Sequence, residues 1–249
     1  GKLHYKSAAY STSEEMEIQD HSVALKEVTK HLMNSDYGVI QDPAEIPAIG
    51  HRVVHGGASF SDTIVIDEKV KEKIKQLFSL APLHNPPNLK GIEVAEEIFP
   101  NAVQVAVFDT AFHQSIPSRA SKYAMPNEFF EEKNIRVYGF HGTSHKYVSE
   151  KANEFLHKDN SSLVTVHLGN GCSMTAVKDG KSVDHTLGFG PVNGLIMGTR
   201  SGDIDQSVIF YMVEKLGYTT KEVSDLLHHK SGMLGLTGYS DLRDIDRKS

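Results

Sequence analysis

The stretch SSLVTVHLGNGCSMTAVKDGKSVDHT, residues 161–186, decides the fold class of this chain. Two runs rich in β-branched residues are joined by Gly169-Asn170-Gly171. A third run follows Asp179-Gly180, a dipeptide typical of hairpin turns. These signals predict three strands that are connected by two tight turns.

The residues before this stretch alternate between strand and helix patterns. AIGHRVVHGG (48–57) is typical of a strand that enters a glycine turn, and AVQVAVFD (102–109) of a buried strand. Helices are predicted after Asp67, as N-cap, and over 143–156. Because strands and helices alternate, the predicted class is α/β.

A polar segment, HKDNSS, separates the helix over 143–156 from the three-strand stretch. Domain boundaries commonly fall in polar linkers. We therefore expect residues 1–157 to belong to a first α/β domain and residues 158–249 to begin a second one.

Composition excludes several classes of protein. The 249 residues are 39% apolar and 23% charged, and 26 basic against 32 acidic residues give a net charge of -6. This balance argues against a nucleic-acid partner. Cys172 is the only cysteine, so no intrachain disulfide forms. The sequence contains neither an apolar run long enough for a membrane span nor a signal-peptide core, so we expect a cytoplasmic protein without a membrane partner.

The turn HLGNG, residues 167–171, is a candidate phosphate cradle. Its glycines expose backbone N–H groups that no side chain obstructs. A plain tight hairpin is the more common use of an isolated Gly-Asn-Gly, so the motif alone leaves both interpretations open. It matches neither a Walker loop nor a dinucleotide-binding glycine motif.

Two arginines could bind an anion through their planar guanidinium groups. Arg200 lies in MGTRSGDID (197–205), before a helix whose first turn is expected to carry Asp203 and Asp205. An ion pair with those aspartates is the alternative. Arg52 ends the strand beside VVHGG, and a surface position without function is its alternative.

Asp109 and His84 complete the candidates before residue 140. Asp109 ends the strand VAVFD, and in an open α/β sheet that end faces the ligand crevice. A turn or helix cap is the alternative for Asp109. His84 lies in the loop APLHNPPN, where a structural role is the alternative.

The stretch YGFHGTSHKYV, residues 138–148, holds His141 and His145 four residues apart. A zinc site would need both on adjacent turns of one helix and a third ligand. Gly142 follows His141, and Thr143 or Ser144 is the expected N-cap, so the helix should begin after His141. A histidine before a helix N-terminus suits phosphate contact, whereas His145 is expected to be structural.

Together these candidates comprise a phosphate-cradling turn, two arginines, a histidine and a carboxylate. No motif for covalent catalysis accompanies them. The set indicates phosphoryl transfer by positioning and charge neutralisation.

Six motifs closely resemble acetate kinase, in order and at similar spacing over residues 48–244: GHRVVHGG, APLHNPPN, VFDTAFHQ, YGFHGTSHKYV, HLGNG and MGTRSGDID. Propionate kinase shares them. The resemblance implies two ribonuclease-H-like α/β domains of the actin, sugar kinase and Hsp70 ATPase type. It implies a magnesium-dependent, reversible transfer of a phosphoryl group between ATP and acetate, which gives acetyl phosphate and ADP. Members of the family form homodimers.

Residue roles follow from the matching motifs. The resemblance makes Arg52 the substrate-binding arginine, with His84 as a further contact, and Asp109 the active-site carboxylate. It makes His141 and Arg200 the pair that stabilises the transition state. Nucleotide contacts would come from two stretches: His167, Leu168, Gly169, Asn170 and Gly171, and then Asp241, Leu242 and Arg243. Acetate is ionised at neutral pH, so Asp109 is expected to orient groups rather than to remove a proton.

The sequence also departs from the family. The family opens with an N-x-G-S-S-S-x-K phosphate loop that contributes to the magnesium site, and nothing similar precedes residue 48. The family also extends beyond residue 249, with the rest of the adenosine pocket. We therefore expect an internal fragment that is inactive alone and has most magnesium ligands outside it. A propionate kinase and a non-catalytic phosphate- or nucleotide-binding remnant are the alternatives.

Overall fold

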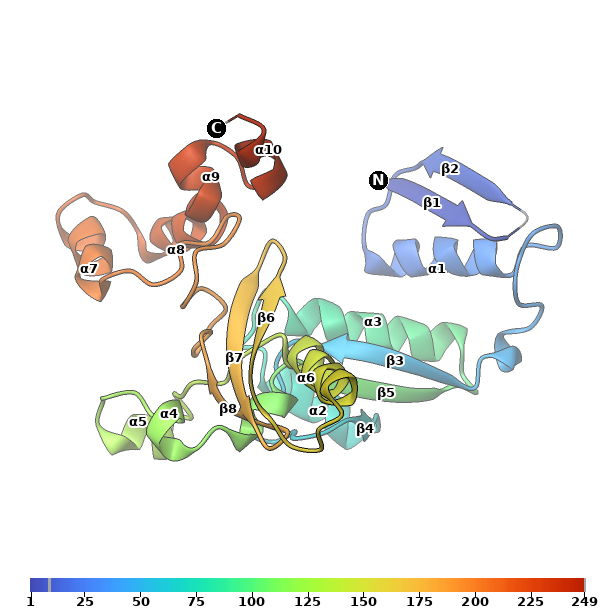
Figure 1. The fold of residues 1–249 in the computed structure, drawn as a ribbon. Helices are drawn as coiled ribbons and strands as arrows, with labels where there is room; N and C mark the ends of the chain where they lie inside the picture. Colours follow the sequence, from blue (N-terminus) through green and yellow to red (C-terminus); the bar gives the residue numbers. More distant parts are fainter. Residues whose placement is uncertain (9, 249) are drawn as a thin grey trace. The chain divides into compact units, whose positions relative to one another are not determined.

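The structure is a computed structural model that describes residues 1–8 and 10–248. The chain forms two compact units (Figure 1), Gly1–Gly56 with Asp62–Phe108 and Gly57–Ser61 with Asp109–Ser249. This division differs from the domain boundary expected near residue 157. The expected boundary stays a prediction, since compactness alone does not define a domain.

The first unit contains a three-stranded sheet with the order β3-β5-β4. Strand β3 (Ala48–Val53) pairs in parallel with β5 (Val103–Phe108), and β4 (Ile64–Val65) pairs antiparallel with β5. Helices α2 (Glu68–Gln76) and α3 (Asn85–Ile98) pack on each other, and α3 also packs on β3. The strands that were predicted within residues 48–57 and 102–109 are confirmed as β3 and β5.

The first unit begins with a two-stranded antiparallel hairpin of β1 (Lys2–Lys6) and β2 (Ser11–Glu15). Helix α1 (His21–Leu32) follows and packs on α3, with the carboxylate of Asp20 as its N-cap. A short 3-10 helix, η1 (Pro43–Glu45), leads into β3.

The second unit is built on the stretch that opened the sequence analysis. Strands β6 (Ser162–Leu168), β7 (Cys172–Lys178) and β8 (Lys181–His185) form an antiparallel sheet in that order. Leu168 pairs with Cys172 across the Gly-Asn-Gly turn, and the β7–β8 register shifts near Ala176. The three predicted strands and both turns are therefore confirmed.

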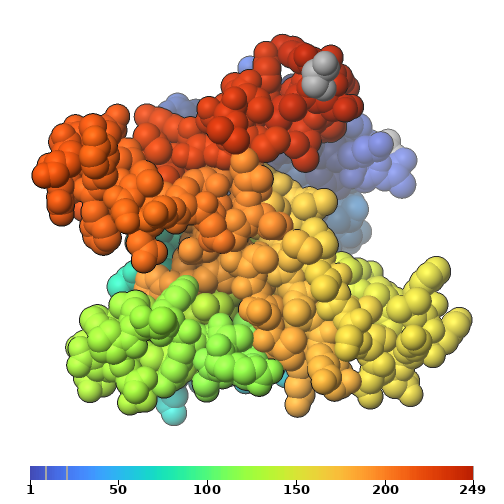
Figure 2. All heavy atoms as spheres, turned by 60° about the vertical axis from the view of Figure 1, so that its left-hand side comes forward, coloured from blue at the N-terminus to red at the C-terminus, as the bar shows by residue number. Residues whose placement is uncertain are grey.

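Helices cover the sheet of the second unit and continue beyond it. Helix α6 (Gly142–Leu156) packs on β6, and the 3-10 helix η2 (Ala111–Ser115) packs on β8 and on α6. The remaining helices are α4 (Ser118–Ser121), α5 (Asn127–Glu131), α7 (Gln206–Glu214), α8 (Thr220–His229), α9 (Gly232–Thr237) and α10 (Leu242–Asp246). In Figure 2 the segment from α7 to α10, orange to red, runs across the upper part of the view.

Each unit has its own apolar centre. In the first it includes Val53, Ile74, Ile92 and Phe108, which are at most 1% exposed. In the second it includes Tyr138, Val177, Leu187 and Met197, but histidines and hydroxyl groups share the interior. Across the described residues, none of the helices combines the length and apolar character that a membrane span needs.

Candidate functional site

The candidate site of the second unit begins at His141, the N-cap of α6. His141 adopts a left-handed conformation with φ 60° and ψ 22°, which is uncommon for residues other than glycine. The N–H of Gly142 donates to the carbonyl oxygen of Asp109 at 2.9 Å. A Cβ on Gly142 would lie 2.3 Å from that oxygen, so this close contact requires glycine. The helix begins after His141 as predicted, but the predicted caps Thr143 and Ser144 are wrong, since both lie in the first turn.

Two buried histidines hold the backbone of Phe140, immediately before His141. The N–H of Phe140 donates to His185 Nε2 at 3.1 Å, and His113 Nε2 lies 2.9 Å from the Phe140 carbonyl oxygen. His185 must therefore carry its proton on Nδ1, and His113 on Nε2. The remaining nitrogens meet the hydroxyl groups of Thr175 at 2.7 Å and Ser182 at 2.9 Å. These bonds stabilise the backbone that presents His141.

The interior histidines are held neutral. Burial lowers the pKa of His113 and of His145 to about 4. Burial, with His113 and His145 as neighbours, also lowers the pKa of His185. A neutral imidazole has one donor and one acceptor, so each ring fits its hydroxyl or backbone partners only in a defined tautomer.

The side chain of His141 continues a chain of polar contacts into the sheet. Its Nδ1 lies 2.8 Å from Ser173 Oγ, which also lies 2.8 Å from His145 Nε2. His145 Nδ1 lies 2.8 Å from Thr165 Oγ1. The ring of His167 stacks on His141 at 4.2 Å between centroids, and its Nδ1 lies 2.9 Å from the Ser144 hydroxyl. His145 is thus buried, and its structural role stays a prediction.

The Gly-Asn-Gly turn brings Arg200 and His141 to one place. A Cβ on Gly171 would lie 3.4 Å from Arg200 Nη1 and 3.4 Å from His141 Nε2. The turn is fixed against the arginine loop because the N–H of Gly198 donates to the carbonyl oxygen of Asn170 at 3.1 Å. The Arg200 guanidinium and the His141 imidazole therefore lie next to each other at the backbone of Gly171.

Arg200 is half-buried and keeps its charge without a carboxylate. Its Nη1 donates to the Pro191 carbonyl oxygen at 3.0 Å, and burial lowers the pKa of its guanidinium. The ion-pair alternative is not observed in the described part of the chain. Instead, Asp203 accepts from the Gly194 N–H, and Asp205 is the N-cap of α7 rather than part of its first turn. A half-buried arginine without a carboxylate partner in the described part of the chain is suited to an anionic ligand.

Asp109 is 2% exposed and follows β5 directly. Its backbone oxygen is the acceptor for Gly142, so its position is tied to the start of α6. The alternative role of Asp109 was that of a helix or turn cap. The helix that follows it, η2, does not support this role, because its N-cap is Thr110.

Arg52 and His84 belong to the first unit: Arg52 lies in β3, and His84 precedes α3, which packs on β3. Asn85 exchanges hydrogen bonds with the backbone of His55, at 3.0 and 3.1 Å, and Asn88 accepts from Val54 N at 3.1 Å. These bonds join the start of α3 to the residues that follow Arg52. His84 is the N-cap of α3, but its side chain makes no capping hydrogen bond.

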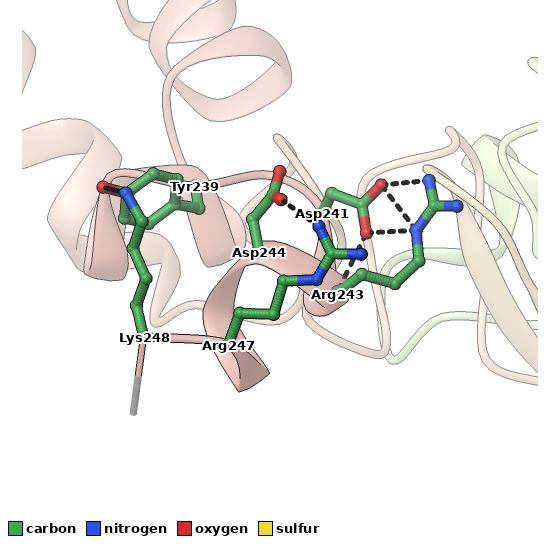
Figure 3. A network of polar contacts seen from close by, with 6 residues as sticks. All are labelled: Tyr239, Asp241, Arg243, Asp244, Arg247 and Lys248. Atoms are coloured by element: carbon green, nitrogen blue, oxygen red, sulfur yellow. Dashed lines mark hydrogen bonds and ion pairs between the residues drawn. The ribbon is translucent and has the colours of Figure 1, made fainter.

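The second predicted nucleotide-binding stretch, Asp241 to Arg243, forms an exposed, self-paired group (Figure 3). Arg243 Nε donates to both carboxylate oxygens of Asp241, at 3.0 and 3.1 Å, and its Nη2 donates at 2.5 Å. The same carboxylate caps α10, and the Arg243 contacts lower the pKa of Asp241 to about 2. Leu242 is 61% exposed between them.

Among residues 1–8 and 10–248, no three His, Cys, Asp or Glu side chains are grouped so that they could hold a metal ion. Mg²⁺ is commonly bound by only one or two carboxylates together with phosphate oxygens. Asp109, a buried carboxylate tied to the start of α6, fits such a ligand set.

The architecture is similar to those of solved propionate and acetate kinase structures. A propionate kinase from Francisella tularensis matches with a TM-score of 0.93 at 44% identity, over 99% of this chain and 63% of that one. Acetate kinase from Porphyromonas gingivalis matches with a TM-score of 0.89 at 44% identity, over 96% and 60%. The predicted α/β fold class is thereby confirmed.

The sequence comparisons give the family. The acetokinase family model matches residues 2–249. An acetate kinase from Flavobacterium johnsoniae is 64% identical over 245 residues, which cover 98% of this chain and 62% of that protein. The chain belongs to the acetokinase family, as the resemblance predicted. It spans about 62% of the length of this curated relative.

Four residues around His141 were missed from the sequence: His113, His185, Ser173 and Thr165. Each reaches the site through a contact between distant segments. The only local signal was the alternation of strand residues, which places Thr165 and His167 on one face of the sheet. On the neighbouring strand, Thr165 pairs with Thr175, and His167 pairs with Ser173.

Proposed function

We propose that this chain carries the phosphoryl-transfer site of an acetate kinase. The convergence of Arg200 Nη1 and His141 Nε2 on the Gly171 position, at 3.4 Å each, supports this proposal most directly. A transferring phosphoryl group carries negative charge on its equatorial oxygens, and preorganised donors at that point lower the barrier. Gly171 places no side chain between the two donors.

The reaction requires no proton transfer. An oxygen of the acetate carboxylate attacks the γ-phosphorus of ATP, the new O–P bond forms as the bond to the ADP oxygen breaks, and ADP leaves with that electron pair. Acetate is ionised at neutral pH, since reference carboxyl pKa values are near ~4. The role proposed for Asp109 is therefore to orient groups and to supply a carboxylate ligand to Mg²⁺. Mg²⁺, when bound, would neutralise charge on the phosphates.

The remaining roles rest on motif matches. We propose that Arg52 and His84 bind the carboxylate substrate. His167 to Gly171 and Asp241 to Arg243 are proposed to contact ATP or ADP. The cytoplasmic location, the homodimeric state and the absence of nucleic-acid and membrane partners stay predictions.

Propionate is the second candidate substrate. The observation in its favour is the likeness to a propionate kinase structure at 44% identity. The two substrates differ by one methylene group, which changes specificity by only roughly 1–3 kcal/mol in an apolar pocket.

Formation of an acyl phosphate tests the proposal. Residues 1–249 alone, and a protein in which they are completed to the length of the curated relatives, are each incubated with ATP, Mg²⁺ and acetate or propionate, and the product is trapped with hydroxylamine as a hydroxamate. We expect acetate-dependent product from the completed protein, formed about 10²–10³-fold more slowly by its Arg200→Ala variant, and none from residues 1–249 alone. Phosphate or ADP binding without any acyl phosphate from the completed protein would instead identify a non-catalytic binding remnant and would overturn the catalytic proposal. The kinetic measurements below use the completed protein.

A further inference from the structure

The hydrogen bonds that link His141 to Ser173, His145 and Thr165 must run in one donor-to-acceptor direction. Ser173 Oγ carries one proton but lies 2.8 Å from a nitrogen of each of two imidazoles, His141 Nδ1 and His145 Nε2. It can donate to one ring and must accept from the other. The proton arrangement on His141 is therefore linked to that on His145.

Thr165 decides between the two possible directions. In the first, Thr165 donates to His145 Nδ1, His145 Nε2 donates to Ser173, and Ser173 donates to His141 Nδ1. In the second, every bond is reversed, and the hydroxyl proton of Thr165 needs an acceptor. Thr165 is 4% exposed, and its hydroxyl has no partner other than His145 in the described part of the chain.

The cost of an unpaired donor favours the first direction. A buried hydroxyl proton without an acceptor is destabilising, whereas an unused lone pair on Thr165 costs little. Ser173 is fully buried and His145 is 1% exposed, so water does not substitute for either partner. His145 is neutral at pH 7 because burial lowers its pKa to about 4, so it holds one ring proton only.

We propose that Thr165, His145 and Ser173 form a hydrogen-bond relay that fixes neutral His141 with its proton on Nε2. This inference rests on the proposed function for its catalytic meaning. Nε2 is the nitrogen that lies 3.4 Å from the Gly171 Cβ position, beside Arg200 Nη1. The relay thus makes His141 a hydrogen-bond donor toward a phosphoryl oxygen without requiring an imidazolium. Thr165, His145 and Ser173 are positioning residues, since they act through His141.

Nitrogen-15 NMR of the histidine side chains measures the tautomer directly. The chain is labelled with ¹⁵N-histidine, and the His141 signals are assigned by their loss in a His141→Gln variant. At pH 8 we expect a protonated, pyrrole-type Nε2 and an unprotonated, pyridine-type Nδ1. The opposite pattern in the unsubstituted chain would overturn the relay.

Variants at Ser173 and Thr165 test the cause. Ser173→Ala removes the link between the two imidazoles and should give a mixture of His141 tautomers. Thr165→Ser keeps the hydroxyl, and Thr165→Val leaves only an unused lone pair on His145 Nδ1, so both should retain the Nε2–H form. The unfolding midpoint and the dispersion of the amide spectrum show whether each variant is folded. An unchanged His141 tautomer in folded Ser173→Ala would contradict the relay.

Kinetics separate the relay from the proposed function. If acyl phosphate forms, Ser173→Ala should lower kcat roughly 10–100-fold, the effect of losing an outer hydrogen-bond partner of a functional imidazole at metal sites. KM for ATP and acetate should stay the same, since the donor acts in the transition state. A relay confirmed by NMR, with no acyl phosphate from the completed protein, would defeat the proposed function and leave the relay intact.

Discussion

Arg200 and Arg243 lie in the same compact unit, and both match family motifs, but their surroundings differ. Arg200 is half-buried, donates to the Pro191 carbonyl oxygen, has no carboxylate partner among residues 1–8 and 10–248, and converges with His141 at Gly171. The side chain of Arg243 is 83% exposed and is already paired with the Asp241 carboxylate. An anionic ligand would complete the site of Arg200, whereas it would have to compete with Asp241 for Arg243. The two arginines should therefore differ in how strongly they affect phosphoryl transfer.

Removal of Arg200 should have the largest effect. We expect Arg200→Ala to lower kcat by about 10²–10³-fold, or about 2.7–4 kcal/mol, as found when one preorganised donor is removed from a charged transition state. Arg200→Lys should not restore the rate, because an ammonium cannot replace the planar fork. Hydroxamate trapping of acyl phosphate measures both. A Lys variant as active as the unsubstituted chain would contradict the geometry proposed for the fork.

Acid should destabilise the region around His141 and leave the Asp241–Arg243 pair unaffected. Folding lowers the pKa of His113 from an ordinary 6.5 to about 4, so the unfolded chain binds more protons between these values. The free energy of unfolding of the second unit should therefore fall as pH drops from about 6.5 toward 4, by up to roughly 3 kcal/mol per such histidine. Urea denaturation at a series of pH values measures this slope.

His185→Gln is a matched variant for this pH dependence. Glutamine keeps an acceptor near the position of Nε2 for the Phe140 N–H but does not titrate. The slope between pH 6.5 and 4 should be shallower in this variant, since one lowered pKa is removed. An equally steep slope would show that acid acts elsewhere.

Gly171→Ala should block the space between Arg200 and His141 without unfolding the chain. Gly171 does not have a positive φ, so alanine is compatible with its backbone, but the methyl group would lie 3.4 Å from both donors. We expect phosphate or ADP affinity to fall at least about tenfold, the equivalent of about 1.4 kcal/mol. Gly190→Ala, where a Cβ meets no atom within 4 Å, is the control and should bind normally. Calorimetric titration distinguishes the two variants.

Arg243→Ala should have the smallest effect. Because Asp241 already holds this exposed side chain, we expect a rise of a few-fold in KM for ATP with an unchanged kcat. Asp241→Asn keeps an N-cap for α10 and should leave the unfolding midpoint nearly unchanged. A loss of kcat as large as that of Arg200→Ala would remove the distinction between the two arginines.

The difference between these regions also shows what could be predicted from sequence. The β6–β8 turns were predictable because Gly-Asn-Gly and Asp-Gly act locally. The hairpin of β1 and β2 was missed. Its short strands are mostly exposed and polar, so they lack the alternating apolar pattern of a half-buried strand.

The candidate site could be predicted only as separate motifs. The positions of Arg200, His141 and Gly171 came from their motifs, whereas their convergence depends on the register of β6 and β7. The roles of Ser173 and Thr165 have no local signal, because a hydroxyl on a strand is ordinary until a histidine of α6 packs against it. The cap at His141 was mispredicted because the contacts of Phe140 and Gly142 outweigh the usual preference for Ser or Thr.

A double-mutant cycle between Arg200 and His141 tests the central claim most directly. Acyl phosphate formation is measured for the unsubstituted chain, Arg200→Ala, His141→Ala and the double variant, each checked for folding. If both side chains act on one phosphoryl group, the double variant should lose clearly less than the sum of the single losses, with a coupling of about 0.5–3 kcal/mol. Additive losses would mean that the two residues act independently, and would contradict a shared site at Gly171.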